Sequence, residues 1–540
     1  MKKFYLFFLS IFSIFIFAQS PNIQFQKTLG GSNQEPLYSI VETLDGGYVA
    51  AGYSKSNISG DKTQNCSGFS DYLIIKCNAT GTLLWQKTIG GEGGDLCTII
   101  KQTQDGGFIL GGTSDSPISG DKTQNSKGVG DYWIVKLNAS GTIEWDKTIG
   151  GLGVDDLKCI NITADGGYIL AGISNSPISG DKTQNYRTDL SITNGNRNDC
   201  WIVKITSTGT VEWDKTIGGD QIDSCNYIEQ TLDGGFIAGC SSSSSISYEK
   251  TENSRGGSDC WILKLNNIGD IVWQKTIGGM YNDGATKIAQ TIDGGYVVGG
   301  ISYSPISGEK NEGILSTSTL YPDIWIVKLN ELGNIMWQNT IGGNVGDYFE
   351  DIKQTNDGGY IIGGYSDSNI SFDKTENNKG IIDIWVVKLN SLGNVMWDKT
   401  IGGDSGDGCT SILQTIDNGF LIGGSSASSI SGDKSEISRG LGDFWIVKLA
   451  PENLSVNQEI SLTETLIYPN PTTSDVNIKF KQYQEKVTIN IVNILGQNVF
   501  KKHFSQIDTI NCEINGASGI YFLTMENQQN EKKTYKIIKN

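Results

Sequence analysis

Acidic residues return at regular intervals in this sequence, and their carboxylates are the first candidates for chemistry. One set stands four residues after a Gly-Gly pair: Glu35, Asp95, Asp155, Asp223, Asp283, Asp347 and Asp407. A second set opens a run of aromatic and β-branched residues: Asp71, Asp131, Asp199, Asp259, Asp323, Asp383 and Asp443. A third set lies in the segments before those runs: Asp61, Asp121, Asp181, Glu249, Glu309, Asp373 and Asp433. Such carboxylates can hold calcium together with carbonyl oxygens, or bind a polyhydroxylated or cationic ligand. Alternatively, each accepts N–H hydrogen bonds inside its own loop.

Catalytic sets that need histidine are absent from most of the chain. The single histidine, His503, stands near the C-terminal end, which removes Ser-His-Asp and Cys-His catalysis and His-ligated metal sites from the rest. The ten cysteines show no CxxC spacing, which argues against structural zinc. A carboxylate pair that cleaves a glycosidic bond stays open, because it needs only an acid and a nucleophile or base. The sequence favours a non-catalytic protein.

A repeated sequence motif marks the predicted strands that must position these acids. The phrase QTQDGGFILGG, from Gln102, has seven versions, and their aspartates follow one another at intervals of 60 to 68 residues. In the second repeat, runs of β-branched and aromatic residues predict strands over 97–103, 107–114, 131–138 and 141–149. The Asp-Gly pair between the first two predicts a tight hairpin turn. It does not predict a phosphate-binding loop, since no helix follows.

Repeated four-stranded antiparallel units predict an all-β fold, either a β-propeller or an open array. The ends of the repeat region favour the propeller. A lone strand of the fourth type, IQFQKTLGG (23–31), precedes the first repeat, and the last repeat ends at FWIVKLA (444–450) without one. We therefore expect a seven-bladed β-propeller over residues 22–450, closed by the N-terminal strand. The tryptophans that recur in the third and fourth strands are expected to pack between blades.

The long segments between the second and third strands form the face on which we expect function. The first set of acids is expected to ring the central channel on that face. Two segments break the repeat, NYRTDLSITNGNRNDC (185–200) and NEGILSTSTLYPD (311–323), and their candidate binding residues are Tyr186, Arg187, Asp189, Arg197 and Tyr321. A tolerated surface insertion is the alternative. In the fourth repeat, Cys240 ends the second strand and Cys260 opens the third, and a disulfide between them is a candidate.

Both ends of the chain indicate export. Residues 1–18 combine Lys2 and Lys3 with an apolar run, which is typical of a secretory signal peptide. No later run is apolar for long enough to predict a transmembrane segment. The net charge of −17 argues against nucleic acid or anionic membranes as partners. A polar linker over 451–462 leads to a small β-sandwich domain over 463–540.

Three motifs in that last domain point to its role. They are Tyr468-Pro469-Asn470-Pro471, Leu495-Gly496-Gln497 and Gly519-Ile520-Tyr521. The domain resembles the C-terminal sorting domain (type A) of type IX secretion cargo in Gram-negative bacteria. The resemblance implies the type IX machinery as a partner, passage through the outer membrane and removal of this domain. The remaining protein would be released or fixed to the cell surface.

The leading functional hypothesis is a secreted or surface-exposed propeller that binds an extracellular glycan or protein and acts in adhesion. A carboxylate-dependent glycoside hydrolase or lyase is the first alternative, motivated by the ring of acids. A passive structural component of the cell surface is the second. No cofactor is required by any of the three, and calcium stays open as a ligand of the acids.

Overall fold

The computed structural model describes residues 20–187, 198–452, 465–527 and 532–540. The expected signal peptide, most of the linker, and the candidate residues Asp189 and Arg197 lie outside these ranges. Within them the chain forms β-strands and no helix, so the predicted all-β class is confirmed. The chain divides into two compact units, over 1–453 and 454–540.

The first unit consists of seven four-stranded antiparallel sheets. Six of them are continuous in the chain: β2 (Leu37–Glu42), β3 (Tyr48–Ser54), β4 (Asp71–Cys77) and β5 (Leu83–Ile89); β6 (Asp95–Gln102), β7 (Phe108–Ser114), β8 (Asp131–Leu137) and β9 (Ile143–Ile149); β10 (Asp155–Ile162), β11 (Tyr168–Ser174), β12 (Asp199–Ile205) and β13 (Val211–Ile217); β14 (Asp223–Gln230), β15 (Phe236–Ser242), β16 (Asp259–Leu265) and β17 (Ile271–Ile277); β18 (Asp283–Gln290), β19 (Tyr296–Ser302), β20 (Asp323–Leu329) and β21 (Ile335–Ile341); β22 (Asp347–Gln354), β23 (Tyr360–Ser366), β24 (Asp383–Leu389) and β25 (Val395–Ile401). The seventh joins both ends of the unit: β26 (Asp407–Gln414), β27 (Phe420–Ser426), β28 (Asp443–Leu449) and β1 (Ile23–Leu29).

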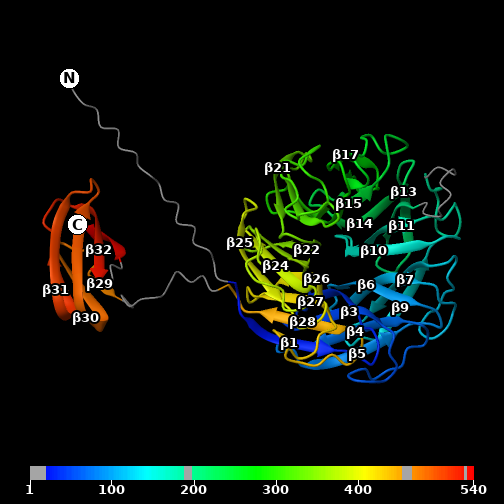
Figure 1. Cartoon of the computed structure of the whole chain (residues 1–540), viewed down its shortest axis with the longest axis horizontal. Coiled ribbons are helices and arrows are strands. Elements are labelled where there is room, and N and C mark those ends of the chain that lie inside the picture. The colour runs from blue at the N-terminus through cyan, green and yellow to red at the C-terminus, as the bar shows by residue number, and fades with distance from the viewer. Residues whose placement is uncertain (1–19, 188–197, 453–464, 528–531) are drawn as a thin grey trace. The chain divides into compact units, whose positions relative to one another are not determined.

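The sheets follow one another around a ring (Figure 1). The first strand of each sheet contacts the first strand of the next, and β2 also contacts β26, so the first sheet lies against the last. In the last sheet β1 pairs antiparallel with β28, with Lys27 opposite Ile446. This propeller-like arrangement places β2, β6, β10, β14, β18, β22 and β26 around its axis.

The repeated DGG phrase forms a turn and also anchors a neighbouring strand. In the second sheet the Gly106 N–H donates to the Thr103 carbonyl at 2.9 Å, and Gly106 has a φ of 80°. The turn is therefore centred one residue earlier than an Asp-Gly hairpin. Asp105 accepts the Gly107 N–H at 2.9 Å and pairs with Lys136 on β8 at 2.9 Å. Its hydrogen bonds to Thr103 and Lys136 outweigh desolvation and lower the pKa of Asp105 to about 2.

Aromatic side chains pack the sheets against one another. The tryptophans of the third strands, such as Trp133, are fully buried or nearly so. Those of the fourth strands meet an aromatic ring of the next sheet edge-on, as Trp85 meets Phe108 with centroids 6.0 Å apart. The predicted packing role of the tryptophans is confirmed.

The second unit is one sheet of five strands: β29 (Leu466–Tyr468), β30 (Asp475–Asn493), β31 (Asn498–Glu513), β32 (Gly519–Asn527) and β33 (Lys532–Lys539). Its motifs hold the ends of strands. Asn470 donates to the Lys536 carbonyl at 2.8 Å and accepts the Ile538 N–H at 2.9 Å. Gly496, with a φ of 76°, lies in the turn between β30 and β31, and the Tyr521 hydroxyl donates to the Ala517 carbonyl at 2.7 Å.

Candidate functional site

The first set of acids lies inside the protein. Asp95 is fully buried, and its Oδ2 accepts the Gly91 N–H at 2.7 Å and the Ser116 hydroxyl at 2.9 Å. Corresponding glycine and serine contacts are made by Glu35, Asp155, Asp223, Asp283, Asp347 and Asp407. Each carboxylate thereby holds the loop that leads into its own first strand. This is the structural alternative given for the acids from the sequence.

The second set accepts N–H hydrogen bonds inside its own loop, and the third set joins neighbouring sheets. Asp131 accepts the Lys127 N–H at 2.5 Å; burial raises the pKa of Asp131 to about 6, and the carboxylate of Asp155 on the next sheet adds to the shift. Asp181 accepts the Gly150 N–H at 3.0 Å and forms an ion pair with Lys127. Among the described residues, no group of three or more His, Cys, Asp or Glu side chains could hold a metal ion.

Among the loop residues that the structure describes, Tyr321 is not brought together with Tyr186 and Arg187. Arg187 pairs with Glu249 at 3.0 Å and also donates to the Thr216 carbonyl, so its guanidinium is used within the ring. Tyr186 beside it is half-buried. Tyr321 belongs to another loop and lies close enough to Tyr348 to affect its ionisation. The structure therefore separates Tyr321 from Arg187 and gives the arginine a structural partner.

The predicted Cys240–Cys260 disulfide is wrong. Both cysteines are free, and Cys240 lies opposite Trp261 on β16 while Cys260 lies opposite Ser241 on β15. Successive side chains of a strand point to opposite faces of the sheet. The offset of one residue therefore directs the two sulfur atoms to different faces.

The repeats lose their symmetry along the first strands, next to the axis. Counted from the acid of the first set as residue one, the sixth residue of every repeat is isoleucine: Ile40, Ile100, Ile160, Ile228, Ile288, Ile352 and Ile412. The fifth residue differs from sheet to sheet: Ser39, Ile99, Cys159, Tyr227, Lys287, Asp351 and Ser411. The seventh differs as well: Val41, Lys101, Asn161, Glu229, Ala289, Lys353 and Leu413. Because side chains two apart share a face, these two positions form one asymmetric surface.

That surface borders a cavity on the axis of the ring, which we call the axial cavity. Its volume is about 480 Å³, and it is lined by residues of all seven first strands, among them Tyr38, Lys101, Lys287, Glu350 and Asp351. A β-bulge between Phe349 and Asp351 shifts the register of β22. Glu350 and Asp351 therefore both reach the cavity although they are adjacent in sequence. Sequence reasoning missed these residues, although the variable positions marked them.

Asp351 is the centre of a buried charge network. It accepts the Lys353 ammonium at 2.8 Å and the Ile412 N–H at 3.2 Å, and the Lys287 ammonium lies 3.5 Å away. Burial alone would raise the pKa of Asp351, but the two lysines outweigh it and lower the pKa to about 2. Lys287 also lies over the Tyr227 ring, 4.2 Å from its centroid. Asp351 is thus held ionised at a buried position.

At or beside the axial cavity, burial shifts the pKa values of three other groups toward their neutral forms. Burial raises the pKa of Glu350 to about 7. Burial also raises the pKa of Glu229, whose carboxylate accepts the Gln290 N–H at 2.5 Å. Burial and the neighbouring ammonium groups of Lys353 and Lys287 lower the pKa of Lys101 to about 8. The cavity therefore offers proton donors and acceptors that titrate near neutral pH.

One stacked tyrosine pair borders the axial cavity, and a second lies near Glu350 of its lining. Tyr38 lines it, is 40% exposed and stacks on Tyr53 with centroids 5.9 Å apart. Tyr348 stacks on Tyr365 at 4.8 Å. Burial and the nearby Glu350 carboxylate raise the pKa of Tyr365 to about 12. The pairs place flat apolar surfaces and hydroxyl groups beside the charged lining.

Comparison with known proteins identifies the C-terminal unit more clearly than the ring. A 93-residue match, 32% identical, relates this chain to an endo-acting ulvan lyase of Formosa agariphila, and it covers 17% of this chain and 18% of that enzyme. Hydrazine synthase of Kuenenia stuttgartiensis is 9% identical with a TM-score of 0.37, over 65% of this chain and 86% of that one. Puromycin hydrolase is 8% identical with a TM-score of 0.43, over 83% of this chain and 59% of that one. Likenesses this weak carry no conclusion about the ring.

Residues 466–540 match the secretion system C-terminal sorting domain. The match contains the Tyr468, Gly496 and Tyr521 motifs described above. No helix in the described part of the chain is long and apolar enough to cross a membrane. The C-terminal domain marks the protein as cargo of type IX secretion, exported to the cell surface or the extracellular space.

Proposed function

We propose that the ring is a closed seven-bladed β-propeller that binds an extracellular glycan at its axial cavity. Closure is supported by the pairing of β1 with β28 and by the Arg439–Asp61 ion pair at 2.6 Å, which links the last sheet to the first. The observation that carries the binding proposal is the asymmetric axial cavity with the tyrosine pairs near it. The signal peptide over 1–18 and the sorting domain over 463–540 are then export devices.

The lining suits a sugar better than an apolar ligand. Tyrosine rings offer flat faces for sugar C–H groups and hydroxyls for hydrogen bonds. Glu350, Lys101 and Lys158 add acceptors and donors around the same space. A cavity of about 480 Å³ is in the range of small-molecule sites, which span about 300–1,000 Å³. A few sugar units of a longer chain would fill it.

Binding is tested by retention of the purified chain on a panel of immobilised glycans. The double variant Tyr38→Ala/Tyr348→Ala should lose retention at least tenfold, because it removes one ring from each stacked pair. Tyr248→Ala is the matched control: Tyr248 is 68% exposed and does not line the cavity, so retention should stay unchanged. Retention that is equal in all three proteins would place the glycan elsewhere, and no retention by the wild type would refute the proposal.

Acid–base cleavage of a glycan is a second candidate for the same cavity. The pKa of Glu350 is raised to about 7 by burial, while that of Asp351 beside it falls to about 2. Such opposite shifts in one site are how a fold keeps one carboxyl protonated and another ionised. Incubation of the chain with the retained glycan should then release reducing ends or unsaturated products, and Glu350→Gln should abolish release. A glycan that stays intact after incubation would refute cleavage and leave binding as the only proposed function of the cavity.

A further inference from the structure

Cys240 occupies a position that is glycine in the other six sheets. The equivalents are Gly52, Gly112, Gly172, Gly300, Gly364 and Gly424. A Cβ atom at these glycines would lie 1.7 to 2.1 Å from a carbonyl oxygen in, or directly before, the first strand of the same sheet. A side chain is therefore costly here, and the fourth sheet needs a local reason to carry one.

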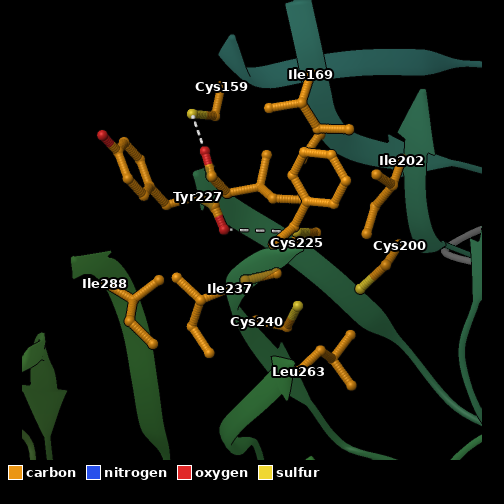
Figure 2. Close-up of a cluster of buried hydrophobic side chains, with 14 of the residues drawn as sticks. Cys159, Ile169, Cys200, Ile202, Cys225, Tyr227, Ile237, Cys240, Leu263 and Ile288 are labelled. Atoms are coloured by element: carbon orange, nitrogen blue, oxygen red, sulfur yellow. Dashed lines mark hydrogen bonds between the residues drawn. The ribbon is translucent and has the colours of Figure 1, made fainter. Parts of the chain in front are cut away.

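Two further cysteines lie beside Cys240 (Figure 2). Cys225 on β14 is its direct cross-strand partner. Cys200 on β12 comes from the preceding, third sheet. Its equivalent in the second sheet is Tyr132, whose hydroxyl oxygen lies 2.7 Å from a Cβ placed on Gly172 of the third sheet. The small Cys200 thus replaces a tyrosine where Cys240 replaces a glycine. All three cysteines are buried, at 0% exposure.

The strand register brings Cys225 and Cys240 within disulfide range. Directly opposite residues of antiparallel strands have Cα atoms about 4.5–5.5 Å apart and side chains on the same face. Disulfides span about 4.4–6.8 Å between Cα atoms. Because the sorting domain directs the chain out of the cell, the cysteines meet an oxidising environment. Cys200, Cys225 and Cys240 are free thiols in the structure. We propose that Cys225 and Cys240 form a disulfide during export and that Cys200 remains a thiol beside it.

The oxidation requires a protein disulfide donor of the cell envelope and proceeds by two exchanges. The Cys225 thiolate attacks one sulfur of the donor disulfide, forms a mixed disulfide and releases the other donor sulfur as a thiolate. Cys240 then loses its proton and attacks the Cys225 sulfur, which releases the second donor thiolate. Two electrons and two protons pass to the donor dithiol. Because the site is buried, the exchange precedes packing of the third sheet against the fourth.

Peptide mapping of the exported protein tests the assignment. Free thiols are alkylated in denaturant, and the chain is cut at Glu229 or Asp233, which separates Cys225 from Cys240. The two resulting peptides should be joined without reductant, and Cys200 should carry the alkyl group. Alkylation of all three cysteines, or a link that includes Cys200, would overturn the proposal.

A glycine variant provides a second readout. Cys240→Gly restores the residue of the other sheets and should fold. Its melting temperature should not respond to reductant, whereas that of the wild type should fall. Cys97→Ala is the matched control, because Cys97 is the equivalent of Cys225 opposite Gly112 and has no cysteine to join. Its response to reductant should equal that of the wild type. An equal response in Cys240→Gly would contradict the disulfide.

Discussion

Replacing Asp351 with asparagine should destabilise the ring strongly. The pKa of Asp351 falls from 3.8 to about 2 because Lys287 and Lys353 overcome the cost of burial. That difference corresponds to about 2.5 kcal/mol of stability at neutral pH. Removing one partner of a buried ion pair typically costs about 3–5 kcal/mol. We therefore expect Asp351→Asn to lower the free energy of unfolding by about 3 kcal/mol.

Urea unfolding followed by tryptophan fluorescence measures this loss. All 12 tryptophans lie in the repeats, so the signal reports the ring alone. Asp156→Asn is the control, because the Asp156–Lys158 pair is partly exposed and should contribute less than about 1 kcal/mol.

The effect of Asp351→Asn should also depend on pH with a defined sign. A carboxyl whose folded-state pKa is lowered stabilises the protein above its unfolded-state pKa, and that stability disappears as pH falls through the folded value. The difference between wild type and Asp351→Asn should therefore shrink between about pH 4 and pH 2. A variant as stable as the wild type at pH 7 would refute the charge network.

Three further predictions address the ring itself. Gly112→Ala should lower the free energy of unfolding by about 1–3 kcal/mol through overpacking, because a Cβ there would lie 1.9 Å from a carbonyl oxygen. Gly406→Ala is the control: a Cβ there has nothing within 4 Å, so the same urea assay should show almost no change. Burial raises the pKa of Asp131 to about 6, so the folded ring binds more protons than the unfolded chain there. Stability should fall as pH rises from about 4 to about 7, which urea midpoints across that range would show. Deleting β1 leaves the edge of β28 unpaired and should produce association on size-exclusion chromatography; an unchanged monomer would contradict closure by β1.

The repeat pattern predicted most of the strands of the ring. In the second sheet, the strands predicted over 97–103 and 131–138 occur as Asp95–Gln102 and Asp131–Leu137. The alternation of β-branched and aromatic residues predicts such strands because their side chains pack on both faces of a buried sheet. Trp133 and Trp85 pack as expected for residues that recur once per sheet. The sequence predicted a turn at Asp105. It did not predict the ion pair with Lys136, because Lys136 lies on β8, away from this turn in the sequence.

The candidate site was harder to find from sequence. Acids that recur in every repeat, such as Asp95, proved to be buried loop supports, because a role needed once per sheet is usually structural. Residues that break the repeat inside a strand, such as Lys101 and Asp351, line the axial cavity. A single strand does not show which of its faces meets the axis. The Cys240–Cys260 prediction failed because one residue of register, which sequence does not reveal, decides the face.

A crystal structure of the chain with the retained glycan tests the central claim most directly. The account predicts glycan density in the axial cavity, with a sugar ring against Tyr38 or Tyr348 and hydrogen bonds to the Glu350 and Lys101 side chains. Glycan bound only at the outer loops around Arg187 or Tyr248, with the cavity unoccupied, would contradict it.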